Sequence, residues 1–151
     1  MVPGRTNNAN AIKISYDFDV YAWVSIWRAI DPTVLSGTTG ISFFYKGSGA
    51  LNTIEFKLRL RDRSFNAGGE DIYFYTSKYI ETDTGGNWTP IKVLYTSFEC
   101  KHPTEGCKAI NGVLDLARVV KIDFAIVNKP DLGNRVGSGS VIIDEISGVK
   151  P

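Results

Sequence analysis

The sequence predicts an all-β fold, a two-sheet antiparallel β-sandwich of the jelly-roll type. Apolar and polar residues alternate in short runs, and turns rich in glycine and asparagine separate these runs at regular spacing. No segment keeps apolar residues at the i, i+3, i+4 and i+7 positions of an amphipathic helix. Short strands in this rhythm are typical of sandwiches and barrels. A length of 151 residues suits one domain with a core of its own.

Eight strands are expected, and the clearest of them is residues 52–61. There the apolar residues from Ile54 to Leu60 alternate with charged ones, so the two kinds point to opposite faces of the strand. The expected strands are 11–18, 21–30, 41–46, 52–61, 72–79, 88–97, 119–128 and 140–147. Residues 1–10 are expected to form a flexible lead-in, and residues 11–151 a single domain.

The expected pairing of these strands collects rings and charges on one surface. In a jelly roll, the first, eighth, third and sixth strands form one sheet, and the second, seventh, fourth and fifth form the other. With this pairing, the alternate positions of the second sheet carry aromatic and charged side chains, whereas those of the first sheet are plainer. The residues predicted to form the surface are Tyr21, Trp23, Trp27, Glu55, Lys57, Arg59, Arg61, Tyr73, Tyr75 and Asp123.

A surface of rings and charges suits a sugar chain. Sugar rings have apolar C–H faces that stack on Trp or Tyr, and hydroxyls at their rims that bond to charged or amide groups. For Trp23 and Trp27 the alternative is a position in the core, because the residues between them on strand 21–30 are also apolar. For Arg59 and Arg61 the alternative is an ordinary solvated face.

The charge and hydropathy of the chain argue against two classes of partner. The net charge of +1 is too small for a general phosphate-binding surface, so a nucleic acid is not expected. No apolar run approaches the roughly 20 residues that a membrane-spanning helix needs.

Two cysteines, Cys100 and Cys107, flank a polar loop that contains His102, the only histidine. They permit a disulfide, two free thiols or half a metal site. A zinc site needs four ligands at closer spacing, so the disulfide is favoured. A disulfide is typical of extracellular proteins, and we therefore expect a secreted protein.

Signals for catalysis are weaker. Asp144 and Glu145 are adjacent in a predicted strand and point to opposite faces, so they cannot act as the carboxylate pair of a glycosidase. A polysaccharide lyase stays open as an alternative, since Lys57, Arg59 and Tyr73 would neutralise a uronate and move protons. The third alternative is a structural or protein-interaction sandwich.

The C-terminal half carries a recognisable pattern of segments. They read WTPIKVLYTSF at 88–98, GVLDLARVVKIDF at 112–124 and GSVIIDEI at 139–146, with SGTTGISFFYK upstream at 36–46. Over residues 11–149 the chain resembles the galactose-binding-like jelly rolls and, closely, the family 11 carbohydrate-binding modules.

This resemblance implies a non-catalytic module that binds a single β-glucan chain in a cleft across its concave sheet. It also implies a place within a larger, multimodular plant-cell-wall hydrolase, in which the module is a monomer. Such modules often carry structural calcium, and Asp144 is the position that the resemblance implies as a ligand. The segment 122–127 lacks the tyrosine that is typical of the family there, so the aromatic platform is expected at Trp23 and Trp27.

Overall fold

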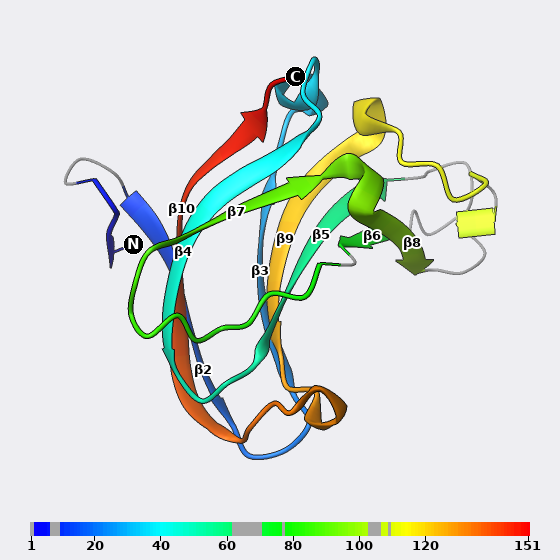
Figure 1. Cartoon of the computed structure of the whole chain (residues 1–151). Coiled ribbons are helices and arrows are strands. Elements are labelled where there is room, and N and C mark those ends of the chain that lie inside the picture. The colour runs from blue at the N-terminus through cyan, green and yellow to red at the C-terminus, as the bar shows by residue number, and fades with distance from the viewer. Residues whose placement is uncertain (1, 7–9, 62–70, 77, 103–106, 109) are drawn as a thin grey trace.

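The computed structural model describes residues 2–6, 10–61, 71–76, 78–102, 107–108 and 110–151. The side chains of Asn10, Arg61, Asp71 and His102 lie outside this described set, although their backbones belong to it. The described residues form two five-stranded sheets that pack face to face as a sandwich (Figure 1). Every pairing between the described strands is antiparallel. The predicted all-β sandwich is therefore confirmed.

The first sheet has the strand order β1-β2-β10-β4-β7. Its strands are β1 (Val2–Pro3), β2 (Asn10–Phe18), β10 (Gly137–Val149), β4 (Gly40–Gly49) and β7 (Thr89–Leu94). Apart from β1, this is the predicted order of the first, eighth, third and sixth strands. The segment expected as a lead-in contributes β1, which pairs with the start of β2.

The second sheet has the order β3-β9-β5-β6-β8. Its strands are β3 (Trp23–Ala29), β9 (Val119–Val127), β5 (Thr53–Arg61), β6 (Asp71–Thr76) and β8 (Phe98–His102). The first four follow the predicted order, and β8 is an addition at the edge. Residues 88–97, expected as one strand, end their pairing at Leu94 because a 3₁₀ turn, η2 (Tyr95–Ser97), follows. The chain then crosses to the second sheet as β8.

The core lies between the inner faces of the two sheets. Phe43 of β4 meets Phe56 of β5 and Phe124 of β9 edge to face, with ring centroids 5.5 and 5.1 Å apart. Phe56 and Phe124 stack at 4.8 Å. Such aromatic contacts add to the stabilisation from burial, and here they join the two sheets at their centres. The apolar alternates of β5 are all buried, so its charged alternates face outward.

Short turns connect the strands, and side chains stabilise several of them. Asp31 accepts a hydrogen bond from the backbone N–H of Thr33 and so caps η1 (Pro32–Leu35). Asp115 caps η3 (Leu116–Arg118) in the same way. Another 3₁₀ turn, η4 (Pro130–Leu132), follows β9. No helix among the described residues is long and apolar enough to cross a membrane.

Candidate functional site

A cleft of about 460 Å³ lies on the outer face of the second sheet. Its lining residues come from the segment before β3, from β3, β9, β5 and β6, and from the loop after β9. They are Tyr21, Trp23, Ser25, Glu55, Lys57, Arg59, Tyr73, Tyr75, Asp123, Val127 and Lys129. The structure thus brings together eight of the ten residues predicted for this surface. Of the other two, the Arg61 side chain lies outside the described set, and Trp27 lies beside the cleft.

The register of the sheet explains why these side chains meet. Paired residues of an antiparallel sheet point to the same face, and Lys57 of β5 pairs with both Asp123 of β9 and Tyr75 of β6. A second row of this face begins with Ser25, which pairs with Ala125 of β9. The row continues to Glu55 of β5, which pairs with Ala125.

Two cations of β5 lie over the two tyrosines of β6. Lys57 Nζ is 4.9 Å from the ring centroid of Tyr75, and Arg59 Cζ is 4.9 Å from that of Tyr73. The two tyrosine rings are 6.3 Å apart. These cation–π contacts hold the rings in place along the β6 side of the cleft.

The tryptophans of β3 are exposed, as the platform hypothesis expects and the core alternative does not. Trp23 is 65% exposed and Trp27 is 53% exposed. Trp23 lines the cleft. Trp27 instead lines an apolar hollow that Ile26 and Val34 also line, and Lys121 Nζ lies 4.6 Å from its ring centroid. The two rings therefore share a strand but not a cleft, and a role of Trp27 in binding stays a prediction.

Glu55 forms ion pairs with two lysines. Lys57 Nζ lies 3.2 Å from Glu55 Oε2, and Lys129 Nζ donates a hydrogen bond to Oε1. Burial favours a higher pKa for the Glu55 carboxyl, but the hydrogen bond from Lys129 and the charges of both lysines outweigh it. The pKa of Glu55 is consequently lowered, and this carboxylate is ionised at neutral pH.

Asp123 of β9 lines the cleft and is almost fully buried, with 1% of its side chain exposed. Arg59 Nε donates a hydrogen bond to its Oδ2 at 2.9 Å, and the Nη2 group donates to the same oxygen. The other oxygen, Oδ1, has no hydrogen-bond partner among the described residues. A buried acceptor without a donor is uncommon in folded proteins, so this atom is a candidate for contact with a ligand.

Burial, followed by the nearby Glu55 carboxylate, raises the pKa of the Tyr75 phenol above its ordinary value. Tyr75 therefore keeps its proton at neutral pH. Its hydroxyl is suited to donate a hydrogen bond rather than to act as a general base.

Sequence alternation missed Lys129, because this residue follows the end of β9. Its position depends on the loop that begins there: the backbone N–H of Lys129 donates to Asn134 Oδ1 at 2.8 Å, and Thr53 Oγ1 donates to the same oxygen at 2.9 Å. The sequence offers one signal for this residue, namely that Lys129 directly follows a predicted strand that carries a site residue. Period-2 alternation could not identify it, because the alternation does not extend into a loop.

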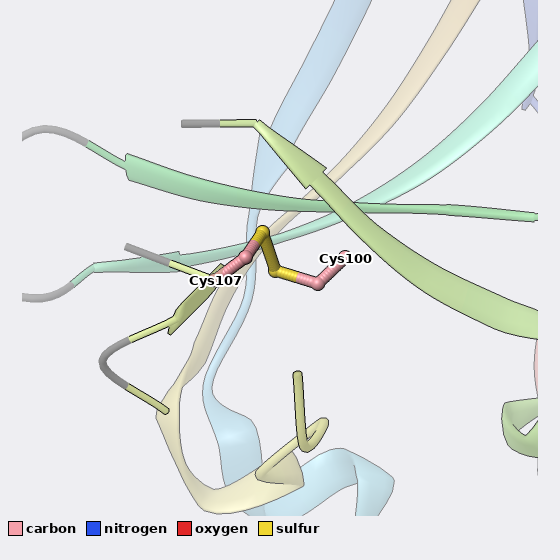
Figure 2. Close-up of a disulfide and its surroundings, with 2 residues drawn as sticks. All are labelled: Cys100 and Cys107. Atoms are coloured by element: carbon pink, nitrogen blue, oxygen red, sulfur yellow. A yellow bond between two sulfur atoms is a disulfide. The ribbon is translucent and has the colours of Figure 1, made fainter. Parts of the chain in front are cut away.

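Of the three alternatives for the cysteines, the structure has the disulfide. Cys100 of β8 is bonded to Cys107, and their Cα atoms are 5.6 Å apart (Figure 2). The bond ties the edge strand of the second sheet to the segment that leads toward η3.

Asp144 lies on β10 of the first sheet, outside the cleft. Its Oδ2 accepts a hydrogen bond from the backbone N–H of Arg5 at 2.6 Å, and its Oδ1 accepts one from the N–H of Glu145 at 2.8 Å. Calcium takes about six to eight oxygen ligands, and the described residues contain no group of three or more His, Cys, Asp or Glu side chains that would hold a metal. Calcium binding at Asp144 stays a prediction.

Two solved structures share this architecture over almost the whole chain. One is the family 11 carbohydrate-binding module from Clostridium thermocellum in complex with a β-1,3-1,4-mixed-linked tetrasaccharide, with a TM-score of 0.72 and 22% identity over 99% of this chain and 82% of that chain. The other is the family 11 module of the cellulosomal cellulase Lic26A-Cel5E of C. thermocellum, with a TM-score of 0.72 and 21% identity over 99% of this chain and 79% of that chain. Identities this low show a common fold.

No curated protein sequence matches the chain significantly. The family profile described as carbohydrate binding domain (family 11) matches residues 1–146, which is nearly the full length. The chain belongs to family 11 of the carbohydrate-binding domains, a family of non-catalytic binding modules.

Proposed function

We propose that the cleft binds a single chain of a soluble β-linked glucan, with mixed-linkage β-1,3-1,4-glucan as the first candidate. The observation that carries the proposal is the arrangement of the cleft. Trp23 stands on its β3 side and Tyr73 and Tyr75 on its β6 side, and charged hydrogen-bonding groups lie between them. The related C. thermocellum module, which was solved with a mixed-linked tetrasaccharide, supports the choice of ligand.

The direction of the cleft fits an extended sugar chain. The lining residues run from β3 across β9 and β5 to β6, which is three inter-strand steps, or about 14 Å at ~4.8 Å per step. An extended glycan lying in this direction stacks its outer sugars on the rings. Its middle sugars then meet Glu55, Asp123 and their cationic partners, which bond to hydroxyls.

The affinity expected from this geometry is modest. The cleft is open to solvent and a glucan chain is flexible, so binding orders the ligand without enclosing it. A dissociation constant of roughly micromolar to millimolar follows.

The setting of the module is also part of the proposal. We infer that the protein is secreted, which the Cys100–Cys107 disulfide supports. A monomeric module within a glycoside hydrolase is the proposed parent arrangement, supported by the similar module of the cellulase Lic26A-Cel5E.

The test is affinity electrophoresis of the chain in gels that contain mixed-linkage β-glucan, xylan or polygalacturonate. Isothermal titration calorimetry then measures the affinity for each polymer that retards the protein. Retardation by the β-glucan, without release of new reducing ends, is the expected result. Release of unsaturated products from polygalacturonate would instead support a lyase, and a lack of retardation by every polymer would support a protein-interaction domain.

A further inference from the structure

We propose that the apolar hollow beside the cleft is a second binding site, which takes a small carboxylic acid with a flat aromatic body. The hollow has a volume of about 610 Å³, which is within the usual range for small-molecule sites. Among the described residues, it has no lining residue in common with the cleft. The proposal is therefore independent of glucan binding.

The hollow is a slot between the inner faces of the two sheets. Ile12 of β2 and Ile41 of β4 line it from the first sheet. Ile26 of β3 and Phe124 of β9 line it from the second. Ile41 and Phe124 are buried, whereas Ile26 is 38% exposed, so the slot opens from the core to solvent along the edge strand β3. A flat ring fits such a space because it contacts both walls at once.

The register of β10 explains why the core does not fill this space. The pairing of β10 with β4 shifts between Asp144 and Ser147, as at a β-bulge. Beyond the shift, Gly148 pairs with the buried Ile41, so an inward-facing position of β10 carries no side chain. Ile146, which lies within the bulge, is exposed and lines the hollow instead of filling it.

Arg28 is the polar group that selects the ligand. It pairs with Ile122 of β9, and its side chain therefore projects to the same side of β3 as that of Ile26. The residue is exposed, and no described residue offers its guanidinium a hydrogen bond or an ion pair. A carboxylate matches this group, because a guanidinium can donate two parallel hydrogen bonds to the two carboxylate oxygens. We therefore expect the ligand to place its ring in the slot and its acid at Arg28.

The other charged and hydroxyl-bearing residues of the lining already have partners. Asp31, the one acid among them, accepts hydrogen bonds from the N–H and the Oγ1 hydroxyl of Thr33. Ser147 Oγ lies 3.0 Å from a serine hydroxyl of β4. Lys121 Nζ lies over the Trp27 ring and brings a second positive charge to the mouth of the hollow. Cations therefore outnumber acids at the mouth, which favours an anionic ligand.

The experiment compares three probes that share one aromatic body and differ in charge. Calorimetry measures the binding of naphthylacetate, naphthylacetamide and naphthylethylammonium to the full 151-residue chain. We expect a dissociation constant below about 1 mM for the acid and one about tenfold higher for the amide, because the amide lacks the charge that Arg28 recognises. The cation should bind more weakly than the amide.

The indole N–H signals of the tryptophans locate the bound probe. The chain has three tryptophans: Trp23 lines the cleft, Trp27 lines the hollow, and Trp88 lies under Lys46 of the first sheet. In a proton–nitrogen correlation spectrum, naphthylacetate should shift the Trp27 signal most. Single substitutions of each tryptophan by phenylalanine assign the three signals.

Two variants test the charge and the slot separately. Arg28→Gln should weaken binding of naphthylacetate about tenfold, to the level of the amide, and leave binding of the amide unchanged. The matched control is Arg135→Gln, because Arg135 is also exposed, has no described partner for its side chain and lies outside the hollow. Ile26→Trp should fill the mouth of the slot and abolish binding of the acid and the amide alike.

Several results would overturn the inference. They are the absence of measurable naphthylacetate binding to the wild-type chain, equal affinities for the acid and its amide, and a folded Arg28→Gln variant that keeps the wild-type affinity for the acid. A shift that is largest at Trp23 would place the probe in the cleft and would also overturn it. Circular dichroism checks the fold of each variant, and if Ile26→Trp does not fold, Arg28→Gln and the tryptophan signals decide.

Discussion

Replacing Trp23 by alanine should weaken glucan binding more than the same change at Trp27, although both tryptophans project from β3 and both are exposed. Trp23 lines the cleft, whereas Trp27 lines the neighbouring apolar hollow beneath Lys121. The difference follows from the twist and register of the sheet and cannot be read from the alternation of the strand.

The size of the effect follows from the area that one sugar face covers. Stacking a pyranose on the Trp23 indole removes on the order of 60 Å² of apolar surface from water, which at 25 cal/mol per Å² is worth 1.5 kcal/mol. That corresponds to about a tenfold loss of affinity for Trp23→Ala. For Trp27→Ala we expect a loss of less than about threefold, since its ring is outside the cleft. Folding stability should change by only about 0.5 kcal/mol for Trp23→Ala, because 65% of this side chain is already exposed.

The assay is calorimetry with mixed-linkage β-glucan, with thermal unfolding as the check on folding. Trp88→Ala is the matched control: Trp88 lies near the first sheet, and Lys46 Nζ covers its ring at 4.9 Å much as Lys121 covers that of Trp27. Its removal should leave affinity unchanged. Wild-type affinity in a folded Trp23→Ala variant, or a larger loss at Trp27 than at Trp23, would refute the assignment of the stacking platform to Trp23.

Three further predictions concern the charges, the metal and the disulfide. Because the pKa of Glu55 is lowered, its ion pairs stabilise the fold at pH values above the ordinary pKa of 4.5, and this stabilisation is lost as the pH falls through the lowered pKa. Lys129→Ala should therefore make the melting temperature less sensitive to acid below about pH 4.5. A melting temperature with the same pH dependence as that of the wild-type chain would contradict this. If Asp144 binds calcium as predicted, a calcium chelator should lower the melting temperature and added calcium should restore it, whereas an unchanged melting temperature would contradict the prediction. Replacing Cys100 and Cys107 by serine should lower the free energy of unfolding, measured in urea, by about 2–3 kcal/mol and leave the affinity for glucan unchanged. A loss of affinity in the folded variant would show instead that the disulfide shapes the cleft.

Prediction from the sequence worked where the signal is local. Successive side chains of a strand point to opposite faces, so the alternation from Ile54 to Leu60 identified the inner and outer faces of β5 without a structure. The same reasoning predicted the outward direction of Trp23. The order of the eight predicted strands also followed, because eight short antiparallel strands in this rhythm suit a jelly roll, which has a set strand order.

Prediction stopped where the outcome depends on contacts between distant segments. The edge strand β8 was not expected, because η2 interrupts a run that reads as one continuous strand. The pairing of β1 with β2 was not expected either. Lys129 reaches Glu55 from a loop whose shape depends on Asn134, and no periodicity extends into that loop.

The sequence by itself determined which side chains face the core and which face solvent, and hence that the second sheet carries rings and charges outward. Only the tertiary structure decided how those side chains share one cleft. It placed Trp23 inside the cleft and Trp27 beside it, paired Arg59 with one oxygen of Asp123, and left the other oxygen without a partner among the described residues. The reason is physical: the direction of a side chain from a strand is set by its own backbone, whereas ion pairs and hollows depend on register and twist across strands that are far apart in the chain.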